Sequence, residues 1–144
     1  MHIIRRVDLN TDEVRIIPVM HYYIHIHYLA GMSVRYHIHQ ILSLSIACGA
    51  DINITVGSLI RVAALCNNII ATDMLIQAGV DVNLCGPCYS AMRRAFQYAS
   101  INVVTQLLAA GATDIPSCSE FLVYTVNIDR DDKIDLLQKL NYKN

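Results

Sequence analysis

The sequence predicts an all-α fold: a solenoid of about three to four helix-turn-helix repeats behind an irregular N-terminal segment. Gly49, Gly79 and Gly111 recur at intervals of 30 and 32 residues. The small-residue pairs Ala63-Ala64 and Ala95-Phe96 each end 15 residues before the next of these glycines. The 144-residue chain is 54% hydrophobic and only 16% charged, which excludes disorder and suits helices that bury one another on several sides. A single amphipathic helix would not produce this recurrence.

The predicted organisation is an N-terminal cap or arm followed by four approximate repeats. The cap or arm covers residues 1–20, and the repeats cover residues 21–53, 54–83, 84–115 and 116–144. In the second repeat, Ala63-Ala64 let one helix approach its neighbours closely, and Met74-Leu75 fill the space behind it. Gly79 then ends the second helix as the C′ residue, where a left-handed backbone is needed.

The other repeats keep this order to different degrees. In the third, Ala95-Phe96 and Leu107-Leu108 play the corresponding parts before Gly111. The fourth keeps the spacing but stops near Leu140, as a terminal cap would. In the first repeat, Leu29-Ala30-Gly31 lies too far upstream of Gly49 unless one helix is longer.

These segments resemble the ankyrin repeat, T-P-L-H-x-A-A-x-x-G-H-x-x-V-V-x-L-L-L-x-x-G-A-D-V-N, at about 33 residues. The segment from Ser58 to Ala64 stands where T-P-L-H-x-A-A would, and the segment from Met74 to Gly79 stands where L-L-L-x-x-G would. The next repeat opens with Ser90 to Phe96 and closes with Val103 to Gly111. The T-P-L-H tetrapeptide is degenerate in every copy, so some of the hydrogen bonds that stiffen a regular repeat are expected to be missing.

The resemblance implies a monomeric protein-interaction module that binds another protein, and neither an enzyme nor a cofactor protein. Partners of ankyrin stacks usually contact the hairpin tips and the exposed side of the inner helices. Carried over to this chain, the loop part of that surface is Thr55, Gly57, Pro87, Tyr89, Ser117 and Ser119. The helical part is Arg61, Arg93, Gln97 and Tyr98. Tyr98 and the arginines are the expected hot spots, because tyrosine and arginine carry disproportionate binding energy at interfaces.

Five histidines suggest a metal site as an alternative. His25 and His27 would share one face of a strand, as would His37 and His39. A hairpin turning near Met32 would bring these four imidazoles together and could hold zinc, iron or copper. On helices, only His21 and His25 would share a face. Histidines on a half-buried surface of an irregular first repeat are the competing interpretation.

A second alternative is redox chemistry at Cys85-Gly86-Pro87-Cys88. This motif is identical to the C-G-P-C of thioredoxin-like oxidoreductases, in which the first thiol has a lowered pKa at a helix N-terminus. Here it directly follows Asp81-Val82-Asn83, where an ankyrin stack places a hairpin loop. No later alternation of strands accompanies it. Two cysteines in a surface loop are therefore the competing interpretation.

Charge and composition predict the compartment and exclude several partners. The net charge is −1 with no basic stripe evident along the chain, so neither nucleic-acid binding nor membrane association is expected. Five irregularly spaced cysteines and acidic residues soon after the start favour reduced thiols in the cytoplasm. The Ile-, Asn- and Tyr-rich usage fits an AT-rich genome, such as that of a large DNA virus or an intracellular parasite. Short ankyrin proteins there resemble inhibitors of host signalling proteins, which places this chain in the host cytoplasm.

Overall fold

The computed structural model describes residues 4–7, 14–17, 19–54, 58–84, 90–123 and 128–141. Within these ranges the chain forms two strands, β1 (Ile4–Val7) and β2 (Val14–Ile17). It also forms eight helices: α1 (Val19–Arg35), α2 (His39–Ala47), α3 (Leu59–Leu65), α4 (Ile69–Gln77), α5 (Ala91–Tyr98), α6 (Ile101–Ala109), α7 (Cys118–Leu122) and α8 (Arg130–Asn141). The predicted helical character is confirmed for residues 19–141 as far as they are described.

The N-terminal strands are the departure from an all-α class. β1 and β2 pair antiparallel, with Ile4 opposite Ile17 and Val7 opposite Val14. These strands lie within the segment that was predicted as a cap or arm. The helices begin at Val19, directly after it.

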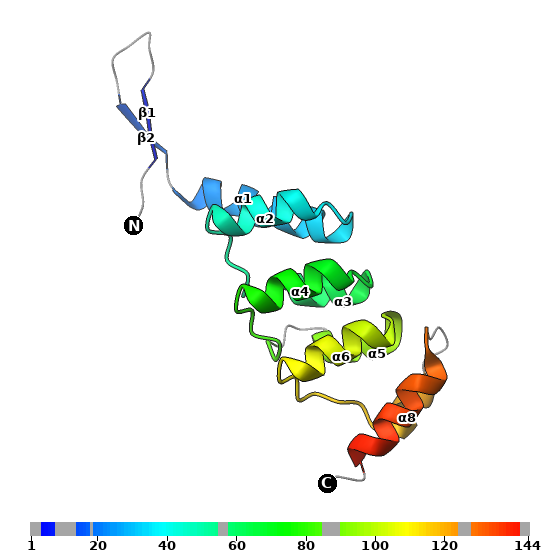
Figure 1. Cartoon of the computed structure of the whole chain (residues 1–144). Helices are drawn as coiled ribbons and strands as arrows, with labels where there is room; N and C mark the ends of the chain where they lie inside the picture. Colours follow the sequence, from blue (N-terminus) through cyan, green and yellow to red (C-terminus); the bar gives the residue numbers. More distant parts are fainter. Residues whose placement is uncertain are drawn as a thin grey trace.

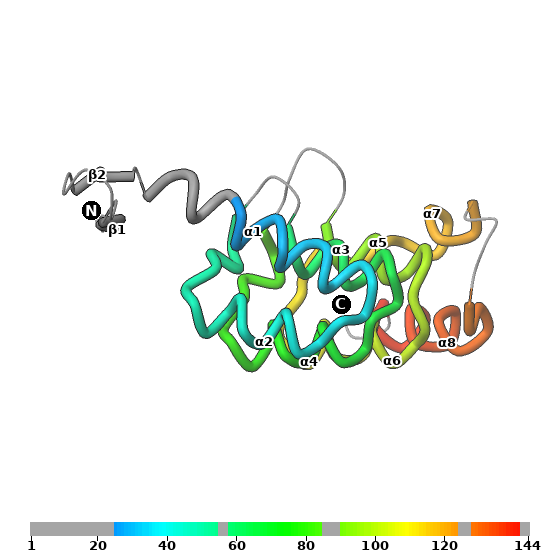
Figure 2. Tube along the Cα trace, turned by 90° about the horizontal axis from the view of Figure 1, so that it is seen from above, coloured from blue at the N-terminus to red at the C-terminus, as the bar shows by residue number. Residues whose placement is uncertain are grey.

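The helices form successive pairs that stack on one another in two rows (Figures 1 and 2). We call α1, α3, α5 and α7 the first-helix row, and α2, α4, α6 and α8 the second-helix row. Contacts join the members of each pair, and they also join α1 to α3, α3 to α5, α2 to α4 and α4 to α6. Neither helix of a pair could bury its apolar side alone, so neighbouring pairs bury it together.

The recurring glycines end the second helices in the predicted left-handed conformation. The φ angles of Gly49, Gly79 and Gly111 are 89°, 85° and 92°. At the end of α4, the Gly79 N–H donates to Ile76 O at 3.0 Å and the Val80 N–H donates to Leu75 O at 3.0 Å. This double bond is the Schellman motif, which satisfies carbonyls at the helix end. The C′ role predicted for Gly79 is confirmed.

Substitution of Gly79 by valine is expected to lower the free energy of unfolding by about 1–3 kcal/mol, because a β-branched residue adopts a left-handed backbone only with strain. A Cβ at this position would meet nothing within 4 Å, so the loss is purely conformational. Urea unfolding followed by far-UV circular dichroism measures it. Gly31 provides the control: it lies inside α1 with equally open space, and Gly31→Ala is expected to stabilise by about 0.5–1 kcal/mol. Equal effects at the two positions would contradict this account.

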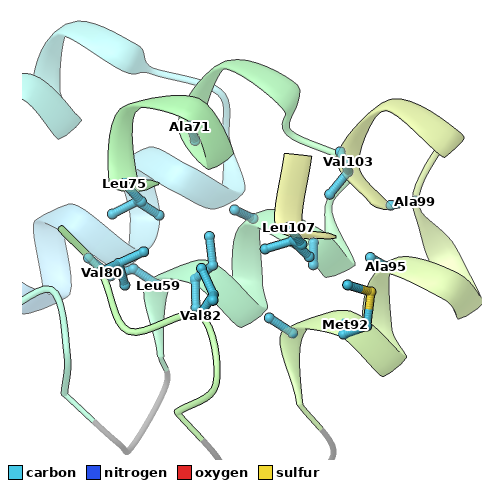
Figure 3. Close-up of a cluster of buried hydrophobic side chains, with 14 of the residues drawn as sticks. Leu59, Ala71, Leu75, Val80, Val82, Met92, Ala95, Ala99, Val103 and Leu107 are labelled. Atoms are coloured by element: carbon cyan, nitrogen blue, oxygen red, sulfur yellow. The ribbon is translucent and has the colours of Figure 1, made fainter. Parts of the chain in front are cut away.

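Small residues allow the first helices to approach one another closely. Ala63, Ala64, Ala91 and Ala95 are fully buried where α3 meets α5. Leu75 from α4 and Leu107 from α6 fill the space behind them, as Figure 3 shows. The alanine pair of the second repeat thus packs as its sequence predicted.

The first pair contains the longer helix that its glycine spacing required. α1 has 17 residues, whereas α3 has 7. Ser33 and Val34 precede Gly49 by the same distance at which Ala63 and Ala64 precede Gly79, and both are buried. The Ser33 Oγ donates to Ala30 O at 2.7 Å, which satisfies its buried hydroxyl. Gly31 therefore lies within α1 and does not end a helix.

Polar side chains join one repeat to the next along the edge that follows the second helices. Within each turn, the Asp51 and Asp81 carboxylates accept from the N–H groups of Asn53 and Asn83, each at 2.9 Å. Between turns, Asn53 Oδ1 accepts from the Asp81 N–H at 2.7 Å, and Asn83 Oδ1 accepts from the Thr113 N–H at 2.8 Å. The D-x-N spacing thus fixes the register of three successive pairs.

A second set of links lies at the opposite end of the pairs, where each first helix turns into its second. Asn68 caps α4 by accepting from the Ala71 N–H at 3.0 Å, and its amide donates to Val34 O of the preceding pair at 2.9 Å. Asn67 Oδ1 accepts from the Ser100 N–H of the following pair at 2.8 Å. Both ends of the stack are therefore held by hydrogen bonds between pairs.

The fourth pair is attached by individual side chains. Phe121 of α7 meets Phe96 of α5 edge-on, with ring centroids 5.7 Å apart, and both rings are fully buried. From α8, the buried Lys133 Nζ donates to Phe96 O at 3.0 Å and to Ala99 O at 2.5 Å. A cation at this place complements the C-terminal end of α5, whose last carbonyls need partners.

Candidate functional site

The first-helix row gathers arginines without acidic residues. α1, α3 and α5 contain Arg35, Arg61, Arg93 and Arg94 and no aspartate or glutamate. Acidic residues occur in the second-helix row, as Asp73 on α4 and Asp131 on α8 illustrate. The chain with net charge −1 therefore presents helices of a single sign on one side. Such a surface attracts negatively charged partners.

Arg93 is held by two carboxylates, unlike a solvated hot spot. Its Nε lies 2.9 Å from Asp114 Oδ1 and its Nη1 lies 3.3 Å from Glu120 Oε1. The hydrogen bond to Asp114 raises the pKa of Arg93. The pKa of Glu120 is lowered, first by the hydrogen bond from the Ser117 backbone and then by the one from Arg93. Arg93 thus links α5 to α7, and truncating it would disturb the fourth pair as well as any interface.

Beyond Arg93, the α5 residues singled out in the sequence are half-buried. Gln97 and Tyr98 occupy the last turn of this helix. The Arg94 guanidinium lies 5.9 Å from the centre of the Tyr98 ring, within cation–π range. This contact orients both side chains, which lowers the entropy cost of their contributing to an interface.

Two adjoining hollows run across the first-helix row. The larger, about 290 Å³, lies between α1 and α3 and is lined mainly by apolar groups that include Tyr28, Met32, Leu59 and Val62, with Arg35 at its wall. The smaller, about 170 Å³, lies between α3 and α5 and is lined by Arg61, Val62, Leu65 and Arg94. Val62 belongs to both, so we treat the two hollows together as one feature, the α1-α3-α5 groove.

The structure brings together only part of the predicted surface. Arg61 lies in the groove, and Arg93, Gln97 and Tyr98 lie on the neighbouring α5. Thr55, Gly57, Pro87 and Tyr89 lie outside the described residues. At the far end of the row, Ser117 caps α7 through a capping box with Glu120, and its Oγ lies 3.0 Å from that of the exposed Ser119.

Sequence reasoning missed Arg35, Tyr28, Met32 and Val62, and it assigned Arg94 to a solvated face. The signal that could have found the arginines was available: none of the three segments predicted as inner helices contains an acidic residue. The absence of a basic stripe along the sequence was misleading because the arginines lie about one repeat apart and become neighbours only when the helices stack.

The histidine hairpin predicted as one alternative is wrong. α1 continues as a helix from Val19 to Arg35, so His25 and His27 do not share a strand face with His37 and His39. His27 Nδ1 instead accepts from the Asp51 N–H at 3.2 Å, and His39 Nε2 lies 3.1 Å from Asn68 Oδ1. Within the described part of the chain, no three potential metal ligands lie close enough together to hold an ion.

Two further expectations concern segments of different kinds. The redox motif Cys85 to Cys88 lies outside the described residues, so its geometry plays no part in the site. Among the helices of the described ranges, none combines the length and the apolar character that a membrane crossing requires.

Comparison with known proteins finds no family model and no curated protein that matches this sequence. The functional argument therefore depends on the geometry of the stack and on the side chains that it presents.

Proposed function

We propose that this chain is an ankyrin-type repeat protein that binds a partner protein through its first-helix row. The observation that carries the proposal is the α1-α3-α5 groove, in which apolar side chains and arginines from three successive pairs form one recognition surface. The stacked pairs, their left-handed glycines and the D-x-N links between turns support the ankyrin-type assignment.

The physical case for binding is that the scaffold fixes the surface before a partner arrives. The backs of α3 and α5 are fully buried, and both ends of the pairs are tied by Asn67, Asn68 and the asparagine links. Side chains on rigid helices lose little freedom on association, which improves affinity. Tyrosine and arginine side chains in a partly enclosed groove are the residue types that dominate binding energy.

The more specific form of the proposal is inhibition of a host signalling protein by a viral or parasite protein. It follows from the resemblance and from the composition, and it stays a prediction. The same surface would serve it, since an inhibitor of this kind needs only to occupy the partner's binding region.

The double variant Arg61→Ala/Tyr98→Ala is expected to reduce capture of the partner at least tenfold in affinity purification from a host-cell lysate quantified by mass spectrometry. Both side chains lie in or beside the groove, and neither is among the links that hold the fourth pair. Arg93 is avoided because its loss would also break two ion pairs.

The matched control is Asn102→Ala, an exposed position on α6 in the second-helix row. It should capture the same proteins as the unmodified chain, and all three chains should give the same far-UV circular dichroism. A partner retained equally by the double variant, or lost equally with Asn102→Ala, would contradict binding through the first-helix row.

A further inference from the structure

The α1-α3-α5 groove is asymmetric in its chemistry. Its α1-α3 part is lined mainly by apolar groups, with Tyr28, Met32 and Leu59 among them. Its α3-α5 part combines Val62 and Leu65 with two guanidinium groups, those of Arg61 and Arg94. A ligand that fits both parts must place a large apolar side chain in one and negative charge in the other.

We infer that the groove takes an acidic, extended segment of the partner protein, with a large apolar side chain seated between α1 and α3 and a carboxylate seated between Arg61 and Arg94. This inference rests on the proposed function and names the chemistry of its partner. Guanidinium groups match carboxylates with paired hydrogen bonds, and two of them on adjacent helices can hold one carboxylate from both sides.

The charge distribution favours this occupant over others. α1, α3 and α5 contain no acidic residue that would repel a carboxylate. At the α5 end, Arg93 is already paired with Asp114 and Glu120, so the cationic part of the groove centres on Arg61 and Arg94. A nucleic acid would require a longer cationic track than two arginines beside apolar side chains.

The stacking geometry sets the spacing within the segment. The two parts of the groove lie on either side of α3, so their centres are about one helix spacing apart, roughly 8–10 Å. An extended chain advances about 3.3 Å per residue. The apolar residue and the acidic residue should therefore be separated by about two to three positions.

A phage-displayed library of random 12-residue peptides, panned on the intact chain, tests the inference. We expect enriched peptides to contain a large apolar residue with aspartate or glutamate about two to three positions away. A synthetic copy of the most enriched peptide should bind at least tenfold more weakly to Arg61→Glu/Arg94→Glu. Replacing its acidic residue with the amide should weaken binding by a similar factor, and raising the salt concentration should weaken it as well.

Lys139→Glu is the matched control, since it reverses a charge on the exposed side of α8, away from the groove, and should change affinity less than twofold. Enriched peptides without acidic residues that still fail to bind the arginine variant would overturn the acidic specificity and leave the proposed function standing. Peptides that bind the arginine variant undiminished, or a library with no enriched peptide, would overturn both. Enrichment of a phosphate-dependent binder in place of a carboxylate in a follow-up with phosphoserine peptides would also overturn the choice of carboxylate.

Discussion

Replacing Phe96 with alanine is expected to lower the free energy of unfolding by about 3–5 kcal/mol, the range for deleting a fully buried aromatic side chain. Phe96 is 0% exposed and packs edge-on against Phe121, so its loss leaves a cavity between the third and fourth pairs. The measurement is equilibrium unfolding in urea, monitored by far-UV circular dichroism.

The control for Phe96 is another large apolar residue that lies on the surface. Leu44 on α2 is 64% exposed, and Leu44→Ala should change stability by no more than about 0.5 kcal/mol. Losses of similar size at the two positions would show that the packing of the fourth pair against α5 does not contribute as described.

The second large effect is a rise in stability with pH that Lys133 produces. Burial lowers the pKa of Lys133 from 10.5 to about 8, against a smaller opposing effect of the Asp129 charge. Between these two values the unfolded chain binds a proton that the folded chain does not, so the free energy of unfolding increases as the pH rises from about 8 to about 10.5. The full gain is about 3 kcal/mol, at 1.36 kcal/mol for each pH unit.

Comparison with Lys133→Met isolates this contribution. Tyrosines and cysteines titrate in the same range, but they are common to both chains and cancel in the difference between the two unfolding free energies. That difference should move by about 3 kcal/mol in favour of the native sequence from pH 8 to pH 10.5 in urea titrations at each pH. A constant difference across this range would mean that Lys133 keeps its proton in the folded chain.

Much of the stack could be predicted from the sequence because the features that build it are local and repeated. A glycine after each second helix is needed for a left-handed turn, and alanines are needed where α3 meets α5, so both requirements leave a periodic trace. Even the irregular first repeat was predictable in part, since the distance to Gly49 demanded a longer α1.

The candidate site was less predictable because its chemistry depends on which side chains meet after stacking. Arg61 and Arg94 are 33 residues apart in sequence but line one hollow. Arg93 matched an interface hot spot by residue type, yet Asp114 and Glu120 engage it within the chain. Likewise, the charged run around Lys133 suggested a solvated helix cap, and only packing shows that its ammonium group reaches the carbonyls of α5.

The pairwise contacts of the stack have a consequence for how the chain responds to a bound partner. Because each pair is supported chiefly by its neighbours, opening can start at an end and spread inward, as in a row of leaning books. A ligand seated across α1, α3 and α5 would clamp three pairs at once. Amide hydrogens throughout those helices should then exchange more slowly when it is bound, whereas α8, which no part of the groove touches, should keep its rate of fraying.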